Sequence, residues 1–142
     1  MPVYGSGKNV RDWIHVDDHC RAVAILLESD GVDGEVFNIG AGNELDVLAI
    51  TSAILKRLGK PATLIRHVED RPGHDRRYAV DSAKLTQRTG WSPRHSFEQG
   101  IADTIDWYGA RRDWWEPIKS GEFRAYYERM YGSRKVLKEV GP

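Results

Sequence analysis

The chain has 142 residues, 40% of them hydrophobic, and its 21 basic side chains balance its 21 acidic ones. This composition is sufficient for a buried core and excludes a disordered segment. The zero net charge argues against whole-domain nucleic-acid binding, and no apolar run approaches the ~20 residues of a membrane helix. The N-terminal residues have no apolar signal region and Cys20 is the single cysteine, so we expect a reducing, cytoplasmic location.

The N-terminal part of the chain predicts a strand followed by a helix. Residues 10–16 are expected to form the strand, and Asp17 or Asp18 is expected to cap a helix that runs to about Glu28. The helix interior, Cys20–Leu27, is apolar nearly all round, so we expect other elements to cover it on more than one side. Cys20 itself is expected to be a buried apolar residue.

The rest of the chain continues to alternate short strands with helices, which is typical of an α/β fold. The expected strands are Glu35–Ile39, Leu64–Val68 and Tyr78–Val80, and the expected helices are Val47–Leu58, Ser82–Thr89, Ser96–Tyr108 and about Glu122–Tyr131. Asp46 and Ser96 are the expected N-caps, while Gly59 and Gly90 end two of the helices. Residues 133–142 form a polar tail.

Motifs for cofactor binding, covalent catalysis and metal binding are missing or poorly placed. Gly40-Ala-Gly42 follows an expected strand but has no third glycine, so no dinucleotide-binding residues are predicted. Two tyrosine–lysine pairs, Tyr4 with Lys8 and Tyr131 with Lys135, have the spacing of a catalytic pair on one helix face. Glycines lie between the members of each pair and disfavour a helix there. A strand-to-helix junction separates His15 from His19, which favours helix capping by aspartate over metal binding. We therefore predict neither catalytic nor metal-ligating residues.

The polar loop Asp70–Tyr78 contains the clearest candidates for ligand binding. Its three arginines and His74 lie around a Pro-Gly turn, and arginine binds phosphate bidentately. The alternative is a solvated loop whose ion pairs contribute little energy. Arg11 lies in a strand-like segment, so its charge needs an anionic partner, which is either Asp12 or a ligand.

Several segments in this order resemble the C-terminal part of the dTDP-glucose 4,6-dehydratases, a family of extended short-chain dehydrogenases. They are YGSGKNVRDWIHVDDHCRA, GEVFNIGAGNE, DRPGHDRRYAVDSAKL, GWSP, TIDWY and RDWWEPIKSGEF. The resemblance runs from residue 2 to about 132. RDW-x-H-V-x-D-H is shared by many nucleotide-sugar enzymes, whereas RPGHDRRYAVD with the later DWWEP is more specific to this family.

The resemblance implies a nucleotide-sugar site. Arg11 is expected to meet the diphosphate, Arg71 and His74 to line the nucleotide site, and Tyr131 to contact the substrate. Arg11 and the turn at 71–77 are therefore expected to converge. Val47 departs from the family, because many members have a substrate-contacting Asn at that position by direct count.

The resemblance also implies the domain organisation. Residues 1–132 are expected to form the nucleotide-sugar-binding lobe, with the last helix and strand of an otherwise missing Rossmann domain at about 17–40. NAD is the cofactor of the full-length family, but we expect this chain alone to bind none and to be inactive. A dTDP-sugar is the expected ligand. Two alternatives remain open: a non-catalytic binding module, or a subunit that completes a cofactor domain in trans. We also expect an exposed apolar patch, through which the chain associates with that missing domain or with itself.

Overall fold

The structure is a computed structural model that describes residues 1–119 and 122–134. Its elements confirm the expected mixture of helices and strands. They are β1 (Pro2–Tyr4), β2 (Val10–Asp12), α1 (Val16–Glu28), β3 (Glu44–Asp46), α2 (Val47–Arg57), a 3₁₀ turn (Ala62–Leu64), β4 (Arg66–Val68), α3 (Ala83–Thr89), α4 (Phe97–Ala110), α5 (Arg112–Trp115), a second 3₁₀ turn (Pro117–Lys119), α6 (Glu122–Tyr127) and a π-helical turn (Glu128–Gly132). No helix among the described residues is long and apolar enough to cross a bilayer.

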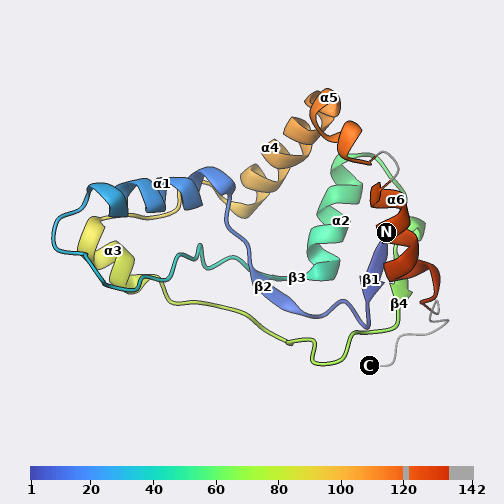
Figure 1. The fold of residues 1–142 in the computed structure, drawn as a ribbon, viewed down its shortest axis with the longest axis horizontal. Helices are drawn as coiled ribbons and strands as arrows, with labels where there is room; N and C mark the ends of the chain where they lie inside the picture. The colour runs from blue at the N-terminus through green and yellow to red at the C-terminus, as the bar shows by residue number, and fades with distance from the viewer. Residues whose placement is uncertain (120–121, 135–142) are drawn as a thin grey trace.

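The molecule is elongated, and its two ends are joined by long irregular stretches of chain (Figure 1). At one end α1 lies beside α3. At the other end β1 pairs in parallel with β4, with Val3 opposite His67, and α2 and α6 lie close by. Between the ends, β2 pairs antiparallel with β3, with Arg11 opposite Leu45. The four strands thus form two separate two-stranded sheets.

Each end has its own small group of buried side chains. Ala22 of α1, Leu85 of α3 and Trp91 are fully buried together at the first end. At the second end the buried side chains come from β1, β4 and α2, namely Val3, Val68, Ile50 and Leu55. The Asp46 side chain caps α2, Ser96 caps α4, and Gly90 ends α3 in the left-handed conformation, all as expected.

Two of the expected strands are wrong. Glu35–Ile39 is extended but forms no strand, and Val36 is 81% exposed. Tyr78–Val80 is also irregular, and only the neighbouring Arg77 makes a single bridge, to Val10. A strand needs a neighbour for its backbone hydrogen bonds. No described strand pairs with Glu35–Ile39, and Tyr78–Val80 meets β2 only through the bond from the amide of Tyr78 to the carbonyl of Val10. The strand expected over residues 10–16 is shorter than predicted, because β2 ends at Asp12.

The expected N-cap of α1 is also wrong. The helix begins at Val16, and its N-cap is His15, whose Nδ1 accepts a hydrogen bond from the amide of Asp17 at 3.3 Å. Asp17 and Asp18 therefore occupy the first turn, where negative charge favours the helix dipole.

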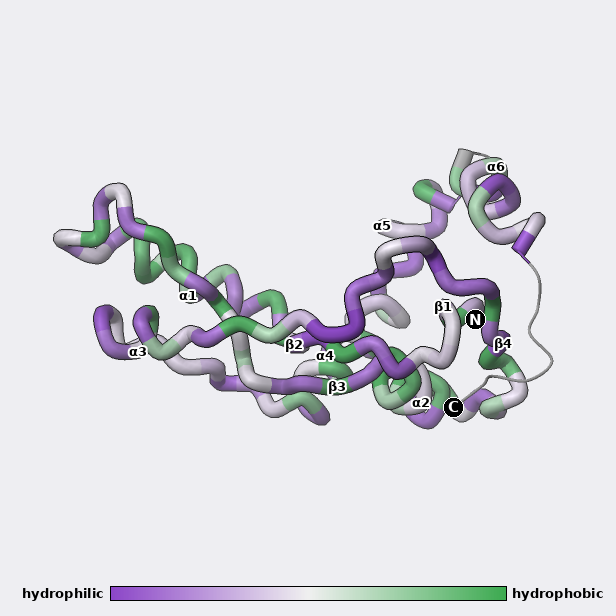
Figure 2. The backbone as a smooth tube through the Cα atoms, turned by 90° about the horizontal axis from the view of Figure 1, so that it is seen from below, coloured by the Kyte–Doolittle hydropathy of each residue, from purple (hydrophilic) through white to green (hydrophobic). Residues whose placement is uncertain are grey.

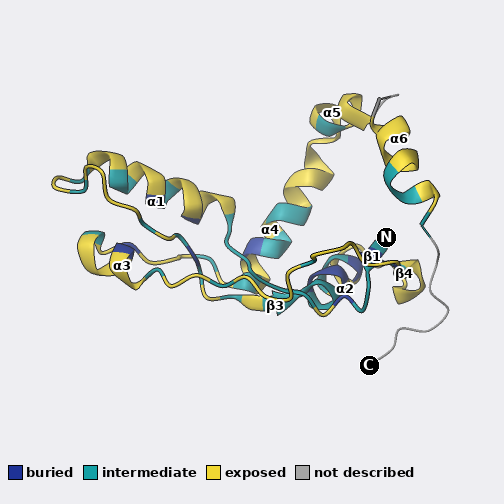
Figure 3. Cartoon of the chain, turned by 60° about the horizontal axis from the view of Figure 1, so that its bottom comes forward, coloured by how far each residue is buried: buried dark blue, intermediate teal, exposed yellow. Residues whose placement is uncertain are grey.

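Helix α1 is covered on one side only. Ala22, Ile25 and Leu26 pack toward the core, but a second apolar stripe is exposed, and its members are Val16, Cys20, Val23, Ala24 and Leu27. Leu27 is 83% exposed, and the expectation that Cys20 is buried is wrong. Figure 2 shows hydrophobic turns along α1, and Figure 3 shows how much of the helix is exposed. This stripe is the apolar patch expected from the sequence.

The carboxylate of Asp18 connects α1 to the segment that leads into α4. It is 1% exposed and accepts hydrogen bonds from the amides of Arg94 and His95, both at 2.9 Å, and from the side chains of His95 and Arg21. Burial by itself raises the pKa of Asp18, but these hydrogen bonds outweigh burial and hold the pKa well below its ordinary value. Asp18 is therefore an ionised, fully hydrogen-bonded buried group.

We expect Asp18→Ala to lower the free energy of unfolding by about 3 kcal/mol, because it leaves buried donors without an acceptor. The folded-state pKa is lowered, so the contribution of Asp18 is complete above its ordinary value of 3.8 and is lost as the pH falls further. Urea unfolding at pH 7 and pH 3 measures both effects. Asp17→Ala, on the exposed neighbour, is the control and should change stability by less than about 1 kcal/mol. Equal effects of the two substitutions would contradict this account.

Candidate functional site

The loop between β4 and α3 is attached to β2 by backbone and side-chain hydrogen bonds. The amide of Val10 donates to the carbonyl of Arg76 at 2.8 Å, and the amide of Tyr78 donates back to the carbonyl of Val10 at 3.0 Å. Asn9 Nδ2 also donates to the carbonyl of Asp75 at 3.0 Å. These bonds hold the 70–78 loop, named here the arginine loop, against the strand that carries Arg11.

Arg11 lies on β2 and extends over the arginine loop. Its two terminal nitrogens donate to the carbonyls of Val10 at 2.7 Å and Asp75 at 3.0 Å, and its guanidinium lies 4.5 Å from the ring centre of Tyr78. Asp12, the alternative partner in the sequence, accepts instead from the amide of Asn43. Within the described part of the chain Arg11 therefore has no carboxylate partner, which leaves its charge available to an anionic ligand.

The arginines of the loop differ in their partners. Arg77 makes a bidentate ion pair with Glu44 of β3, at 2.6 and 2.8 Å. Arg71 makes no ion pair with any described residue, and its side chain is exposed. Arg71 is therefore the loop arginine that we expect to meet a phosphate, whereas Arg77 anchors the loop to the sheet.

Three charged side chains influence the pKa of Tyr78. Its hydroxyl donates to the carboxylate of Asp75, and this bond, with the negative charge of Asp75, raises the pKa of Tyr78. The positive charges of Arg11 and Arg71 both act in the opposite direction. Two residues separated by 60 positions in the sequence thus place their charges within electrostatic reach of the same hydroxyl.

Aromatic rings gather at the other end of the arginine loop. The ring of Tyr4, at the end of β1, lies 6.0 Å from His74 in an edge-on arrangement and 6.0 Å from Tyr131. A hydrogen bond shared with Tyr4, together with burial, raises the pKa of Tyr131 to about 12. Arg134 covers the Tyr4 ring at 4.5 Å. The residues around Tyr4 thus form an aromatic cluster.

Asp70 positions the imidazole of His74. Its carboxylate contacts His74 Nδ1 at 2.7 Å and accepts the amide of Arg71 at 2.9 Å. Burial raises the pKa of Asp70, but the bonds to His74 and Arg71 outweigh burial and lower it below its ordinary value. Gly5 makes room for this carboxylate, because its φ is +49° and a Cβ there would lie 2.6 Å from Asp70 Oδ2.

Arg11, Arg71, His74 and Tyr131 are thus all carried by, or in contact with, one loop and the strands beside it. Tyr4 joins the cluster, although the sequence analysis considered it only as half of a tyrosine–lysine pair. Tyr4 could have been identified from the sequence, because it opens the YGSGKNVRDW segment that resembles the dehydratases. Val47 lies elsewhere, as the first residue of α2, and its hydrophobic side chain can offer no hydrogen bond. The second tyrosine–lysine pair joins Tyr131 to Lys135, and Lys135 lies outside the described residues.

The described residues do not fit a dinucleotide cofactor. Gly40-Ala-Gly42 leads into β3, so it does not open a helix whose amides could receive a pyrophosphate. The carboxylate of Asp12 also lies against Gly40, where a Cβ would be 2.4 Å from Oδ2. A carboxylate at this place repels phosphate, so the glycine turn is not suited to bind the pyrophosphate of a dinucleotide.

The chain matches known nucleotide-sugar enzymes over most of its length. The family described as GDP-mannose 4,6 dehydratase matches residues 1–104. The dTDP-glucose 4,6-dehydratase of Streptomyces niveus is 49% identical over 120 residues, which are 84% of this chain and 35% of that protein. The chain spans 35–39% of the length of such curated relatives.

Solved structures agree with this similarity. The dTDP-glucose 4,6-dehydratase DesIV of Streptomyces venezuelae, solved with NAD bound, matches with a TM-score of 0.79 and 45% identity over 84% of this chain and 37% of its own. The UDP-glucuronic acid 4-epimerase of Bacillus cereus, in complex with UDP-glucuronic acid and NAD, matches with a TM-score of 0.72 and 29% identity over 78% of this chain and 35% of its own. This chain therefore belongs to the GDP-mannose 4,6 dehydratase family and is similar to the C-terminal portion of dTDP-glucose 4,6-dehydratases.

Proposed function

We propose that this chain is the nucleotide-sugar-binding part of a dTDP-glucose 4,6-dehydratase. The full enzyme converts dTDP-glucose into dTDP-4-keto-6-deoxyglucose and water, with NAD as its cofactor. The observation that carries the proposal is the hydrogen bond from Arg11 to the carbonyl of Asp75, because it attaches Arg11 to the loop that also carries Arg71. Neither arginine makes an ion pair with a described carboxylate, so both are suited to an anionic ligand, and a pyrophosphate is a suitable anion.

The aromatic cluster provides the second half of the proposed site. A nucleobase binds well against aromatic faces, and such stacking is worth roughly 1–3 kcal/mol per base. His74 and Tyr131 both contact the Tyr4 ring, and the same loop that carries His74 also carries Arg71. We therefore assign the base to the aromatic cluster and the diphosphate to Arg11 and Arg71.

We also infer that the exposed stripe of α1 is an interface with the remaining part of the enzyme. The curated relatives are more than twice as long as this chain, so most of their length has no counterpart in it. Leu27 and Val36 are more than four-fifths exposed, although both are apolar. The Rossmann part of the family, encoded with this chain or supplied in trans, would cover this stripe.

We expect Arg71→Ala to weaken binding of dTDP-glucose at least 10-fold, because the diphosphate loses one bidentate partner. Isothermal titration calorimetry of the purified chain measures this affinity. Arg66→Ala removes an exposed arginine from the neighbouring strand β4 and should leave the affinity unchanged. No heat with the wild-type chain at millimolar ligand would refute the site, and so would an equal loss in both variants.

The chain alone is expected not to convert dTDP-glucose, because its described residues do not fit NAD and the sequence analysis predicts no catalytic residues. Incubation with NAD and dTDP-glucose, followed by chromatography of the sugar nucleotides, tests this expectation. The full-length Streptomyces niveus relative serves as the positive control. Formation of the 4-keto-6-deoxy sugar by the purified chain would contradict the proposal.

Introducing a charge into the exposed stripe of α1 should disrupt the proposed interface without disturbing the fold. We expect Leu27→Asp to abolish co-purification of the chain with a separately expressed Rossmann part of a relative, because a carboxylate would be buried without a partner. Asp30→Asn, just beyond the same helix, is the control and should still co-purify. The interface is refuted if wild type and Leu27→Asp are captured equally, or if neither is captured.

A further inference from the structure

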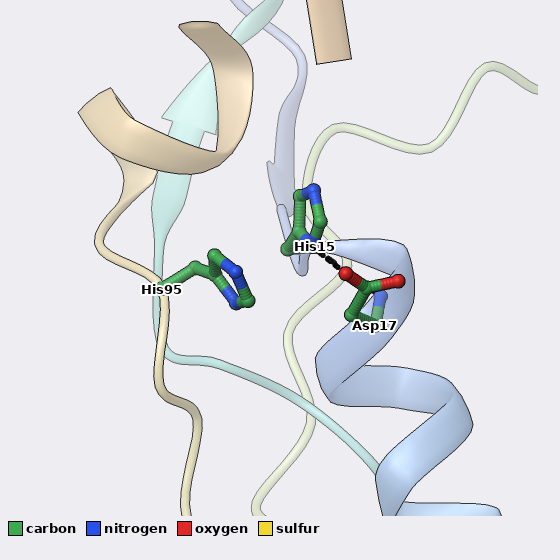
Figure 4. Close-up of side chains that lie close together, drawn as sticks. All are labelled: His15, Asp17 and His95. Atoms are coloured by element: carbon green, nitrogen blue, oxygen red, sulfur yellow. Dashed lines mark hydrogen bonds and ion pairs between the residues drawn. The ribbon is translucent and has the colours of Figure 1, made fainter. Parts of the chain in front are cut away.

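A second cluster of polar side chains lies where α1 and α4 approach each other, away from the arginine loop. His15, Asp17 and His95 each place a nitrogen or carboxylate oxygen there, and these atoms lie within 4.8 Å of one another. The rings of the two histidines are stacked, with centroids 4.1 Å apart and planes inclined by 30°. Figure 4 shows His95 directed from the start of α4 toward His15 and Asp17. No residue of this cluster belongs to the proposed nucleotide site.

His95 is held with one nitrogen free. Its Nδ1 lies 2.9 Å from Asp18 Oδ2, and its amide donates to the same oxygen. Asp18 Oδ2 already accepts the amide of His95, so His95 Nδ1, which lies beside the same oxygen, is assigned as the ring nitrogen that donates to it. In the neutral imidazole the lone pair is then on Nε2. A carboxylate behind a histidine is the arrangement that orients metal-binding imidazoles and makes them better ligands.

His15 also has a lone pair that faces the cluster. Its Nδ1 accepts the amide of Asp17 at 3.3 Å, which is long for a hydrogen bond and therefore weak. The same nitrogen lies 3.8 Å from Asp17 Oδ2. A cation placed between these two atoms would replace a weak capping bond with a stronger interaction.

The spacing of the three side chains suits a small divalent cation after modest adjustment. Ligand atoms around a tetrahedral zinc ion, with bonds of 2.0–2.2 Å, lie about 3.3 Å apart. The atoms here are separated by 4.8 Å at most, so they must approach by up to about 1.5 Å. The side chain of Asp17 is 76% exposed and free to rotate, so it can make most of this movement.

The surroundings leave room for a further ligand. His15, Asp17 and His95 line a groove with a volume of about 700 Å³, whose other walls include Trp13, Phe97 and Ile101. Asp103 lines the same groove and adds a second negative charge to it. Three protein ligands and an open groove are the arrangement of zinc sites that keep one position for water or an exchangeable ligand.

We propose that His15, Asp17 and His95 bind one divalent transition-metal ion of the zinc type, with one coordination position open to the groove. Two imidazole nitrogens and one carboxylate oxygen are a suitable donor set for zinc and poor ligands for magnesium or calcium. The site joins the N-terminus of α1 to the start of α4. It does not depend on the proposed nucleotide site.

Zinc titration of the full chain tests this inference by calorimetry, with the bound metal counted after dialysis. We expect one ion per chain at pH 7.5, and binding that weakens as the pH falls, because protons compete with the metal for its ligand atoms. His15→Ala and Asp17→Asn should each weaken zinc binding at least 10-fold. His19→Ala, one helical turn from His15 on α1, should bind zinc as the wild type does.

Two further measurements separate loss of the ligands from loss of the fold. Asp17→Asn leaves the Asp18 network intact, so its circular dichroism spectrum should match the wild type even where its zinc affinity is reduced. Cobalt(II) should give the visible absorption bands of a tetrahedral site in the wild type, and His15→Ala should remove them. The proposal fails if zinc binding is not saturable, if the ligand variants bind normally, or if His19→Ala loses as much affinity as they do.

Discussion

The buried carboxylate of Asp18 is the interaction on which the arrangement of α1 and α4 depends. It accepts hydrogen bonds from the amides of Arg94 and His95 and from the side chain of His95, which are more than 70 residues away along the chain. It also accepts one from the side chain of Arg21 on its own helix. A buried charge is tolerated only when its hydrogen-bonding capacity is filled, so the start of α1 and the approach to α4 must stay together. The carbonyl of the same residue accepts the indole N–H of Trp91, which adds a link to the core.

Asp18 also determines the chemistry of its neighbours. By accepting from His95 Nδ1, it selects the tautomer that keeps the lone pair on Nε2. A structural ion pair thus prepares an arrangement with the features of a metal site. The electrostatics of the arginine loop follow a similar logic, because Asp70 and Glu44 hold His74 and Arg77 in place while Arg11 and Arg71 lack a carboxylate partner among the described residues.

Helix α1 has one covered face and one exposed apolar face. In an α/β protein, a helix that is apolar on two sides packs between two layers, and extended segments beside it pair within a sheet. Within this chain, α3 and Trp91 provide one of those layers. Glu35–Ile39 remains extended without a strand partner, and α1 keeps an open face beside it.

Much of the local structure was predictable from the sequence, because it depends on neighbouring residues. The caps at Asp46 and Ser96, the helix end at Gly90 and the polar arginine loop follow from hydrogen bonds and backbone preferences within a few positions. The segments shared with the dehydratases likewise indicated the family, which the comparisons confirm. The roles of Arg11, Arg71, His74 and Tyr131 remain predictions, although the structure places these residues around one loop.

The rest was decided only in three dimensions. Whether an extended segment becomes a strand depends on a partner that the local sequence does not specify, so Glu35–Ile39 and Tyr78–Val80 were wrongly predicted. The burial of Asp18 depends on donors from Arg94 and His95, which are 76 and 77 residues away along the chain. The sequence by itself determined the longer helices, several of their caps and the family, whereas the short helix α5 was not predicted. Tertiary packing decided which charges are paired and which histidines meet, because electrostatic partners are chosen by distance in space and not by separation along the chain.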